Sequence, residues 1–274
     1  YFEWNFSYYL NLIMVKKQKT YFNWSTGKDS ALALYKILQQ KEFTVEKLLT
    51  NVNSDFGRVS MHGLREELLD LQVQNLGFPL QKIHFPGDVS MSLYNKIMKE
   101  NMQKIQQEKL EYAVFGDIFL EDLKAYRDTK LAEVGLQGVY PLWKQDTKVL
   151  LSEFLDLGFK AITVCVNAKL LDKSFVGRVL DEQFIADLPK DVDVCGENGE
   201  FHTFVFDGPI FKKPVAFELG EKVLRTYSSN AEVMDDNCSS YLDQKNEDCF
   251  QNKTEEKPWD TGFWYCDLIP EKVI

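Results

Sequence analysis

The sequence lacks the features that mark secreted proteins, membrane-spanning proteins and proteins stabilised by a structural metal ion. Its 274 residues include five widely spaced cysteines, and none of them forms a C-x-x-C pair, which excludes the commonest zinc and dithiol patterns. An odd, sparse set of thiols fits a reducing compartment. There is no run of about 18 apolar residues, as a membrane-spanning helix requires. We therefore expect a cytoplasmic protein with no membrane partner.

The chain is also short of positive charge. It has 32 Lys and Arg residues against 42 Asp and Glu, a formal net charge of −10. Nucleic-acid binding depends on clustered Lys and Arg at the phosphate backbone, so nucleic acid is not an expected partner. Apolar residues, in contrast, make up 45% of the chain, enough for the core of one large α/β domain or two smaller ones. The composition leaves a homodimer open.

From about residue 19, short apolar runs alternate with helical patterns, which is typical of parallel βα units. The sequence predicts four such units, with strands at Thr20–Trp24, Leu48–Asn53, Gln81–Phe85 and Tyr112–Gly116 and helices at Asp29–Gln40, Leu64–Leu76, Ser90–Glu108 and Glu121–Val134. Two apolar faces on the fourth strand are expected inside a parallel sheet. The first part of the chain is therefore predicted to be an α/β domain with a parallel sheet.

The pattern changes after residue 136. A helix at Lys148–Leu157, a strand at Lys160–Asn167 and a hairpin at Val192–Asp207, turning at Asn198-Gly199, are predicted there. We expect residues 1–18 to be a leader outside the fold, with 1–13 an upstream extension before Met14. The first α/β domain then covers residues 19–136, and a smaller α/β substrate domain covers residues 137–223. A mobile acidic loop with a docking C-terminal strand covers residues 224–274.

The strongest motif is Ser25–Ser30, between the first predicted strand and the first helix. The first N–H groups of a helix lack intrahelical partners, and the helix dipole favours anions. Gly27 lets the backbone approach phosphates, Lys28 neutralises charge, and Asp29 can hold Mg²⁺ or cap the helix. A Walker A loop would need Gly at position 22, where the chain has Phe22. The remaining alternative is a plain helix-capping segment.

The Ser25–Ser30 segment resembles the S-G-G-K-D-S loop of the PP-loop ATP pyrophosphatases. The rest of the chain resembles one branch of them, the diphthine–ammonia ligase family, in four segments: Trp24–Ser30, Gly116–Ile118 with Glu121-Asp122, Tyr140–Trp143, and Cys195–Thr203 running on to Asp207–Pro209. The resemblance spans about residues 19–223 and is weaker at Trp259–Leu268. It implies a HUP-type, Rossmann-like parallel-sheet ATP-binding domain followed by a second, smaller α/β domain.

The resemblance also implies an activity. ATP with Mg²⁺ would lie on the loop, a substrate carboxylate would attack the α-phosphate, and ammonia or an amine would displace AMP to form an amide. The implied ATP-binding residues are Ser25, Thr26, Gly27, Lys28, Asp29, Ser30, Asn51, His62, Gly116 and Asp117, with Asp29 as the Mg²⁺ ligand. The implied catalytic and substrate residues are Glu121, Glu197, Asn198, Gly199, Glu200 and His202. In the family's named reaction the acid is diphthine, a modified histidine on translation elongation factor 2.

The loop departs from the family pattern at one position. Thr26 stands where the family's loop usually has its first glycine. A β-branched residue is acceptable there only if φ stays negative. We therefore expect a negative φ at Thr26, with its N–H still donating to phosphate.

Other interpretations of these residues stay open. Asp117 and Glu121 lie at the end of the fourth strand, where ligands bind in open α/β sheets, but they also suit helix capping. Glu197, Glu200 and His202 could bind an amine and shuttle its proton, or could form a solvated turn. Three alternative functions remain: the same ligation on a small acid, a non-catalytic adenine-nucleotide-binding regulator, and a tRNA-modifying thiolase. The missing C-x-x-C pair and the acidic charge count against the last.

Overall fold

The computed structural model describes residues 17–60, 62–87, 89–227 and 261–271. The predicted leader segment 1–13 and the predicted acidic loop 228–258 lie outside these residues. Among the described helices, none has the length and apolar character that crossing a bilayer requires.

The first sheet is mainly parallel, as the sequence predicts. Its strands are β1 (Gln18–Asn23), β2 (Phe43–Asn53), β3 (Arg58–Val59), β4 (Leu80–Phe85), β5 (Tyr112–Val114) and β6 (Gln137–Val139). Their order is β3-β2-β1-β5-β6, with β4 also paired to β2. All pairs are parallel except the short β2–β3 pair. The sheet extends through β6, past the domain boundary predicted near residue 136.

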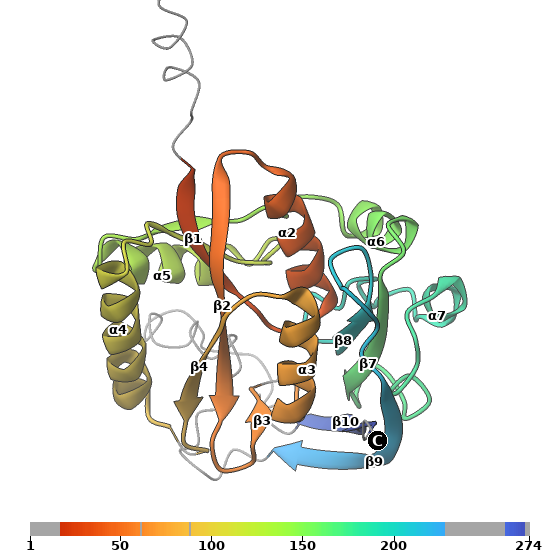
Figure 1. The fold of residues 1–274 in the computed structure, drawn as a ribbon. Helices are drawn as coiled ribbons and strands as arrows, with labels where there is room; N and C mark the ends of the chain where they lie inside the picture. Colours follow the sequence, from red (N-terminus) through yellow and green to blue (C-terminus); the bar gives the residue numbers. More distant parts are fainter. Residues whose placement is uncertain (1–16, 61, 88, 228–260, 272–274) are drawn as a thin grey trace, which may run out of the picture.

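Helices cover both faces of this sheet (Figure 1). Helices α2 (Lys28–Gln39) and α3 (Glu66–Leu76) lie on one face, and α4 (Met91–Gln107) and α5 (Glu121–Ala132) on the other. The central strand β1 is buried on both sides, because Phe22 packs in the α2–α3 core while Tyr21 packs in the α4–α5 core. Helix α3 ends at Gly77, whose φ of 80° places it in the left-handed conformation common at helix ends. The sequence predicted this helix and its end.

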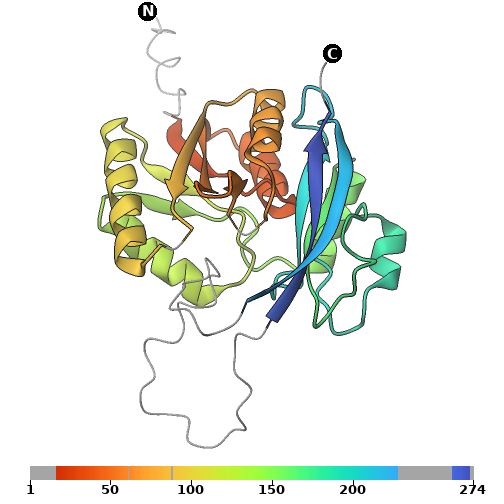
Figure 2. The same ribbon diagram turned by 90° about the horizontal axis from the view of Figure 1, so that it is seen from below.

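The second sheet is antiparallel. It has the order β8-β7-β10-β9, formed by β7 (Lys160–Asn167), β8 (Phe201–Asp207), β9 (Phe217–Tyr227) and β10 (Thr261–Pro270), with α6 (Thr147–Asp156) and α7 (Glu182–Asp187) beside it. Figure 2 shows this sheet next to the α2–α3 side of the first. The predicted C-terminal docking strand is confirmed as β10, which lies between β7 and β9.

The hairpin predicted at Val192–Asp207 is wrong. Residues 192–199 form turns, and β8 pairs with β7 instead of with the segment before it. The cause is the Glu200 side chain, which is buried and accepts hydrogen bonds from the backbone N–H groups of Asp193 and Asn198 at 3.0 and 2.8 Å. The turn backbone therefore folds inward onto a carboxylate and has no partner strand.

The two sheets are joined at the segment between β1 and α2. The Val205 N–H of β8 donates to the Thr26 carbonyl at 3.0 Å. The buried Gln72 of α3 accepts from the Trp24 indole at 2.7 Å and donates to the carbonyls of Thr26 and Val205 at 3.1 and 2.6 Å. One amide side chain on α3 thus ties the segment after β1 to β8, a strand of the second sheet.

Replacing this amide should destabilise the whole protein. Gln72→Leu removes three hydrogen bonds and leaves the buried Trp24 indole N–H without its acceptor, a loss of about 2–4 kcal/mol. The melting temperature should fall by roughly 5–12 °C for a chain of this size. Gln74→Leu, at an exposed position on the same helix, is the control and should change stability by less than about 0.5 kcal/mol. Equal melting temperatures for the two variants would contradict the role given to Gln72.

Candidate functional site

A large cavity lies at the carboxyl edge of the first sheet and reaches the second sheet. Its volume is about 1530 Å³, above the roughly 300–1,000 Å³ usual for small-molecule sites. The segment between β1 and α2, the facing sides of α4 and α5, and the turns before β8 line it. All the site residues predicted from the sequence line it except Thr26 and Glu200. Two otherwise separate parts of the chain therefore share one cavity.

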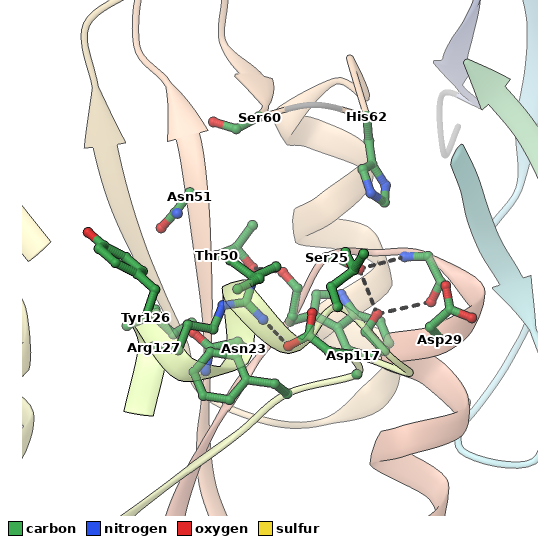
Figure 3. A pocket seen from close by; sticks show the side chains of 18 of the residues that line it. Asn23, Ser25, Asp29, Thr50, Asn51, Ser60, His62, Asp117, Tyr126 and Arg127 are labelled. Atoms are coloured by element: carbon green, nitrogen blue, oxygen red, sulfur yellow. Dashed lines mark hydrogen bonds and ion pairs between the residues drawn. The ribbon is translucent and has the colours of Figure 1, made fainter. Parts of the chain in front are cut away.

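The Ser25–Ser30 loop forms the floor of this cavity at the start of α2. Gly27 is the residue before the helix and has no side-chain cap. The Ser30 hydroxyl donates a hydrogen bond to the Gly27 carbonyl at 2.9 Å and accepts one from the Ser25 hydroxyl at 3.1 Å. Figure 3 shows Ser25 and Asp29 together at this end of the helix. The positive end of the helix dipole thus faces the cavity.

Thr26 corrects the expectation of a negative φ, because its φ is 74°. A non-glycine residue in such a conformation costs about 1–3 kcal/mol and persists only where the surroundings hold it. Here Val205 and Gln72 both donate to its carbonyl, and its hydroxyl lies 3.2 Å from Nδ1 of His62. Tertiary contacts, which sequence spacing does not reveal, hold the loop in this shape.

Lys28 is a buried cation beneath the cavity. Its Nζ lies 2.7 Å from both carboxylate oxygens of Asp29 and 3.9 Å from Oε1 of Glu197. Burial alone would lower the pKa of Lys28, but Asp29, Cys195 and Glu197 raise it above its usual value. The Lys28 side chain is therefore a charged ammonium at neutral pH. Burial raises the pKa of the neighbouring Asp29 carboxyl, against the opposing effect of Lys28.

Glu197 comes from the other part of the site, in the turns before β8. Burial raises the pKa of its carboxyl to about 8, with a further contribution from Asp29 and an opposing one from Lys28. Cys195 is buried close by and donates to the Thr147 carbonyl at 3.3 Å. Burial raises the pKa of this thiol to about 12, so it is protonated and a poor nucleophile.

Gly116 and Asp117 lie at the end of β5, against the first turn of α2. A Cβ at Gly116 would come within 3.0 Å of the backbone of Asp29 and Ser30, so glycine is required for this close packing. Asp117 forms an ion pair with Arg127 of α5, and Figure 3 shows both facing the cavity. Arg127 also lies 4.6 Å from the centre of the Phe115 ring. Helix α5 begins after Leu120 with no side-chain cap hydrogen bond, so Asp117 does not take the helix-capping role that the sequence left open.

His62 and His202 bring the two halves of the site into contact. Their rings stack with centroids 4.9 Å apart and planes at 21°. Burial away from solvent lowers the pKa of His202 to about 4. Burial and the neighbouring His202 together lower the pKa of His62 well below its usual value. Both imidazoles are therefore neutral at pH 7.

The remaining predicted residues differ in their surroundings. The Glu200 carboxylate is turned away from the cavity and bonds the Asp193–Asn198 turn, including the Asn198 side chain at 3.0 Å. Gly199 has a φ of 82° in this turn. Glu121 is exposed at the cavity rim and pairs with Lys144 at 2.7 Å.

Asn51 and Ser60 carry the clearest sign of a missing partner. The Asn51 Oδ1 and Ser60 Oγ atoms are buried without a hydrogen-bond partner among the described residues, and both residues line the cavity. The Ser60 N–H donates to the Asn51 carbonyl at 3.2 Å, so the two are neighbours. Buried polar atoms are nearly always hydrogen-bonded, which makes these two atoms contact points for a ligand or water.

The described residues contain no group of three or more His, Cys, Asp or Glu side chains suited to hold a metal ion. Both oxygens of Asp29, the predicted Mg²⁺ ligand, face the Lys28 ammonium. In nucleotide sites Mg²⁺ takes one or two carboxylates together with phosphate oxygens and water. Asp29 therefore fits Mg²⁺ only when phosphates supply most of the ligands.

Sequence reasoning missed several residues of the site. The Thr203 hydroxyl accepts from the Lys28 N–H at 3.0 Å, and the motif that runs through Thr203 contained this signal. Ser60 lies only two residues before His62, which the sequence did single out. Arg127 and Gln72 gave no signal, because their partners are distant in sequence or are backbone carbonyls.

Two family models match the chain. The Diphthamide synthase N-terminal domain matches residues 18–138, and the Diphthamide synthase C-terminal domain matches residues 146–233. A diphthine–ammonia ligase of Rattus norvegicus is 26% identical over 238 residues, which are 76% of this chain and 86% of that protein. The human protein of the same name is 30% identical over 154 residues, which are 54% of this chain and 55% of that protein.

Among solved structures, a protein of Methanocaldococcus jannaschii described as a predicted subunit of tRNA methyltransferase aligns with 72% of this chain and 100% of its own. The TM-score is 0.35 and the identity 17%, a likeness too weak to bear on function. The two family models, in contrast, take in the strands of both sheets apart from β10. This chain therefore belongs to the diphthamide synthase family.

Proposed function

We propose that this protein is an ATP-dependent ligase that activates a carboxylate by adenylylation, forms an amide, and releases AMP and pyrophosphate. The observation that carries the proposal is the buried Lys28 ammonium under a cavity of about 1530 Å³, reached by residues of both sheets. A cation at a helix N-terminus suits a polyphosphate. The cavity has room beyond a nucleotide for a second substrate.

The nucleotide lies, in this proposal, along the carboxyl edge of the first sheet. Its phosphates rest on Ser25–Ser30, and its base reaches Asn51 and Ser60, whose buried oxygens have no partner among the described residues. Figure 3 shows Asn51 and Ser60 set apart from Asp29, so phosphate and base would bind at different parts of the cavity. Mg²⁺, held by Asp29 and the phosphates, would neutralise charge on the pyrophosphate leaving group.

The turns before β8 would serve the second of two half-reactions. In the first, a carboxylate oxygen of the acceptor attacks the α-phosphorus, the bond from this phosphorus to the oxygen that bridges to the β-phosphate breaks, and pyrophosphate leaves. Ammonia or an amine then attacks the acyl carbon, and AMP leaves with its bonding electrons while the nitrogen loses a proton. Glu197, which lies 3.9 Å from Lys28, binds the incoming nitrogen in this proposal. Positioning of the reactants dominates such chemistry.

The acceptor is a protein-borne diphthine or a small carboxylic acid, with ammonia as the donor. The names of the relatives support the first. The unpaired thiols of Cys165, Cys195 and Cys266 support a reducing, cytoplasmic location.

Product analysis tests the proposal. Incubated with ATP, ammonia and pools of carboxylic acids or the diphthine-bearing protein, the enzyme should release AMP and pyrophosphate when the right acceptor is present. Lys28→Ala removes the buried cation and should slow pyrophosphate release by about 100-fold or more. Lys41→Ala, at an exposed position, is the control. ADP as the main product would contradict the proposal.

Base recognition gives a second prediction. If the Asn51 Oδ1 accepts from the 6-amino group of adenine, Asn51→Leu should reduce the preference for ATP over inosine triphosphate by about 5- to 150-fold, which corresponds to about 1–3 kcal/mol. The measurement is KM for both nucleotides. Asn51→Leu should leave the ratio of ATP to 2′-deoxy-ATP unchanged. A change in that ratio alone would place the ribose, instead of the base, at Asn51.

Glu197 should make the stability of the nucleotide-free protein pH-dependent. Its folded pKa of about 8 lies above the value of roughly 4.3 in an unfolded chain. Between these values the folded state binds more protons, so this carboxyl lowers the free energy of unfolding as pH rises from about 4.5 to 8. Glu197→Gln should become progressively more stable than wild type over that range, measured by denaturant unfolding in EDTA. Glu218→Gln, on an exposed strand position, should not. Parallel pH profiles for wild type and Glu197→Gln would disprove the burial effect.

A further inference from the structure

The left-handed conformation of Thr26 needs support that a glycine would not need. Its φ of 74° is strained for a β-branched side chain, and this residue replaces the first glycine usual in the loop of the family. The residue is fully buried. Something in this chain must therefore compensate for the replacement.

His62 is placed to do so. Its Nδ1 lies 3.2 Å from the Thr26 hydroxyl, and its ring also bonds the backbone carbonyl of Thr203 in β8. A neutral imidazole has one acceptor and one N–H donor, and these two partners match them. The ring lies so close over Gly27 that a Cβ there would come within 3.0 Å of its Cε1.

Strand topology explains how His62 reaches the loop. Strand β4 pairs with β2 over Leu48–Asn53, and β1 occupies the other edge of β2 up to Leu49. The short β3 pairs with Val52 and Asn53, so it must use the β1 edge, beyond the point where β1 ends. The turn after β3 therefore lies near the loop. His62 extends from it toward Ser25, as Figure 3 shows, and its Nδ1 lies 3.2 Å from the Thr26 hydroxyl.

The second sheet makes a further contact with the His62 ring. His202 of β8 stacks on it with centroids 4.9 Å apart. The next residue of β8, Thr203, accepts from the Lys28 N–H at 3.0 Å. The imidazole is thus held between the loop, the β3 turn and the second sheet.

We propose that His62 is a positioning residue, which holds the Thr26 turn in its left-handed shape and so keeps the loop and Lys28 in place for phosphate. The proposal rests on the ATP site proposed above. His62 then affects ATP binding only through Thr26, so the size of its effect depends on which residue stands at position 26.

A double-mutant cycle of Thr26→Gly and His62→Ala on the full chain tests this dependence. The two readouts are the melting temperature without nucleotide and KM for ATP in pyrophosphate release. With Thr at position 26, His62→Ala should raise KM by about tenfold or more and lower the melting temperature; with Gly, the same substitution should change KM by at most about threefold. A glycine adopts the left-handed conformation without support, so it needs no hydroxyl partner.

A matched pair at position 26 isolates the hydroxyl. Thr26→Val keeps the branched shape and loses the hydrogen bond, and it should reproduce the KM increase of His62→Ala. Thr26→Ser keeps the hydroxyl and should lose less than Thr26→Val. Equal effects of His62→Ala with Thr and with Gly at position 26, in both readouts, would overturn the proposal and make His62 a direct ligand contact. Coupling in melting temperature without any pyrophosphate release would contradict the proposed function but support the positioning role.

Discussion

The docking of β8 on the loop between β1 and α2 is the contact on which the site depends. The Thr26 carbonyl accepts from Val205, and the first N–H of α2, at Lys28, donates to Thr203. An N–H group that would otherwise point at a ligand is thus used to hold the second sheet. Neither the loop nor the turns before β8 form the site alone, because each sets the position of the other.

The balance of charge in the site also depends on the contact between β8 and the loop. Bringing Glu197 within 3.9 Å of Lys28 buries a second carboxyl beside Asp29. Two ionised carboxylates next to one ammonium would leave excess negative charge at the start of α2. The raised pKa of Glu197 removes that charge, and the Arg127 partner neutralises Asp117 on the far side. The site can therefore receive a polyanion although the chain as a whole is acidic.

The sequence was informative where chemistry is local. The βα alternation predicted the parallel sheet, the end of α3 at Gly77, and the placement of Ser25–Ser30 at a helix N-terminus. It failed at the hairpin predicted around Glu200, because this carboxylate lies buried and bonds the turn before β8. An acidic residue near Asn-Gly looks solvated in sequence, since burial depends on contacts made by distant strands.

The sequence by itself determined much of the local geometry: where most strands and helices run, where glycine allows close approach, and which motif lies at a helix N-terminus. Only the tertiary structure decided the shape of that motif and its partners. Thr26 was expected at negative φ, yet it has a φ of 74° because Gln72, Val205 and His62 hold it from three other elements. Backbone preference is a property of one residue and its neighbours, worth a few kcal/mol at most. Contacts between residues far apart in the chain outweigh it, and no spacing in the sequence records them.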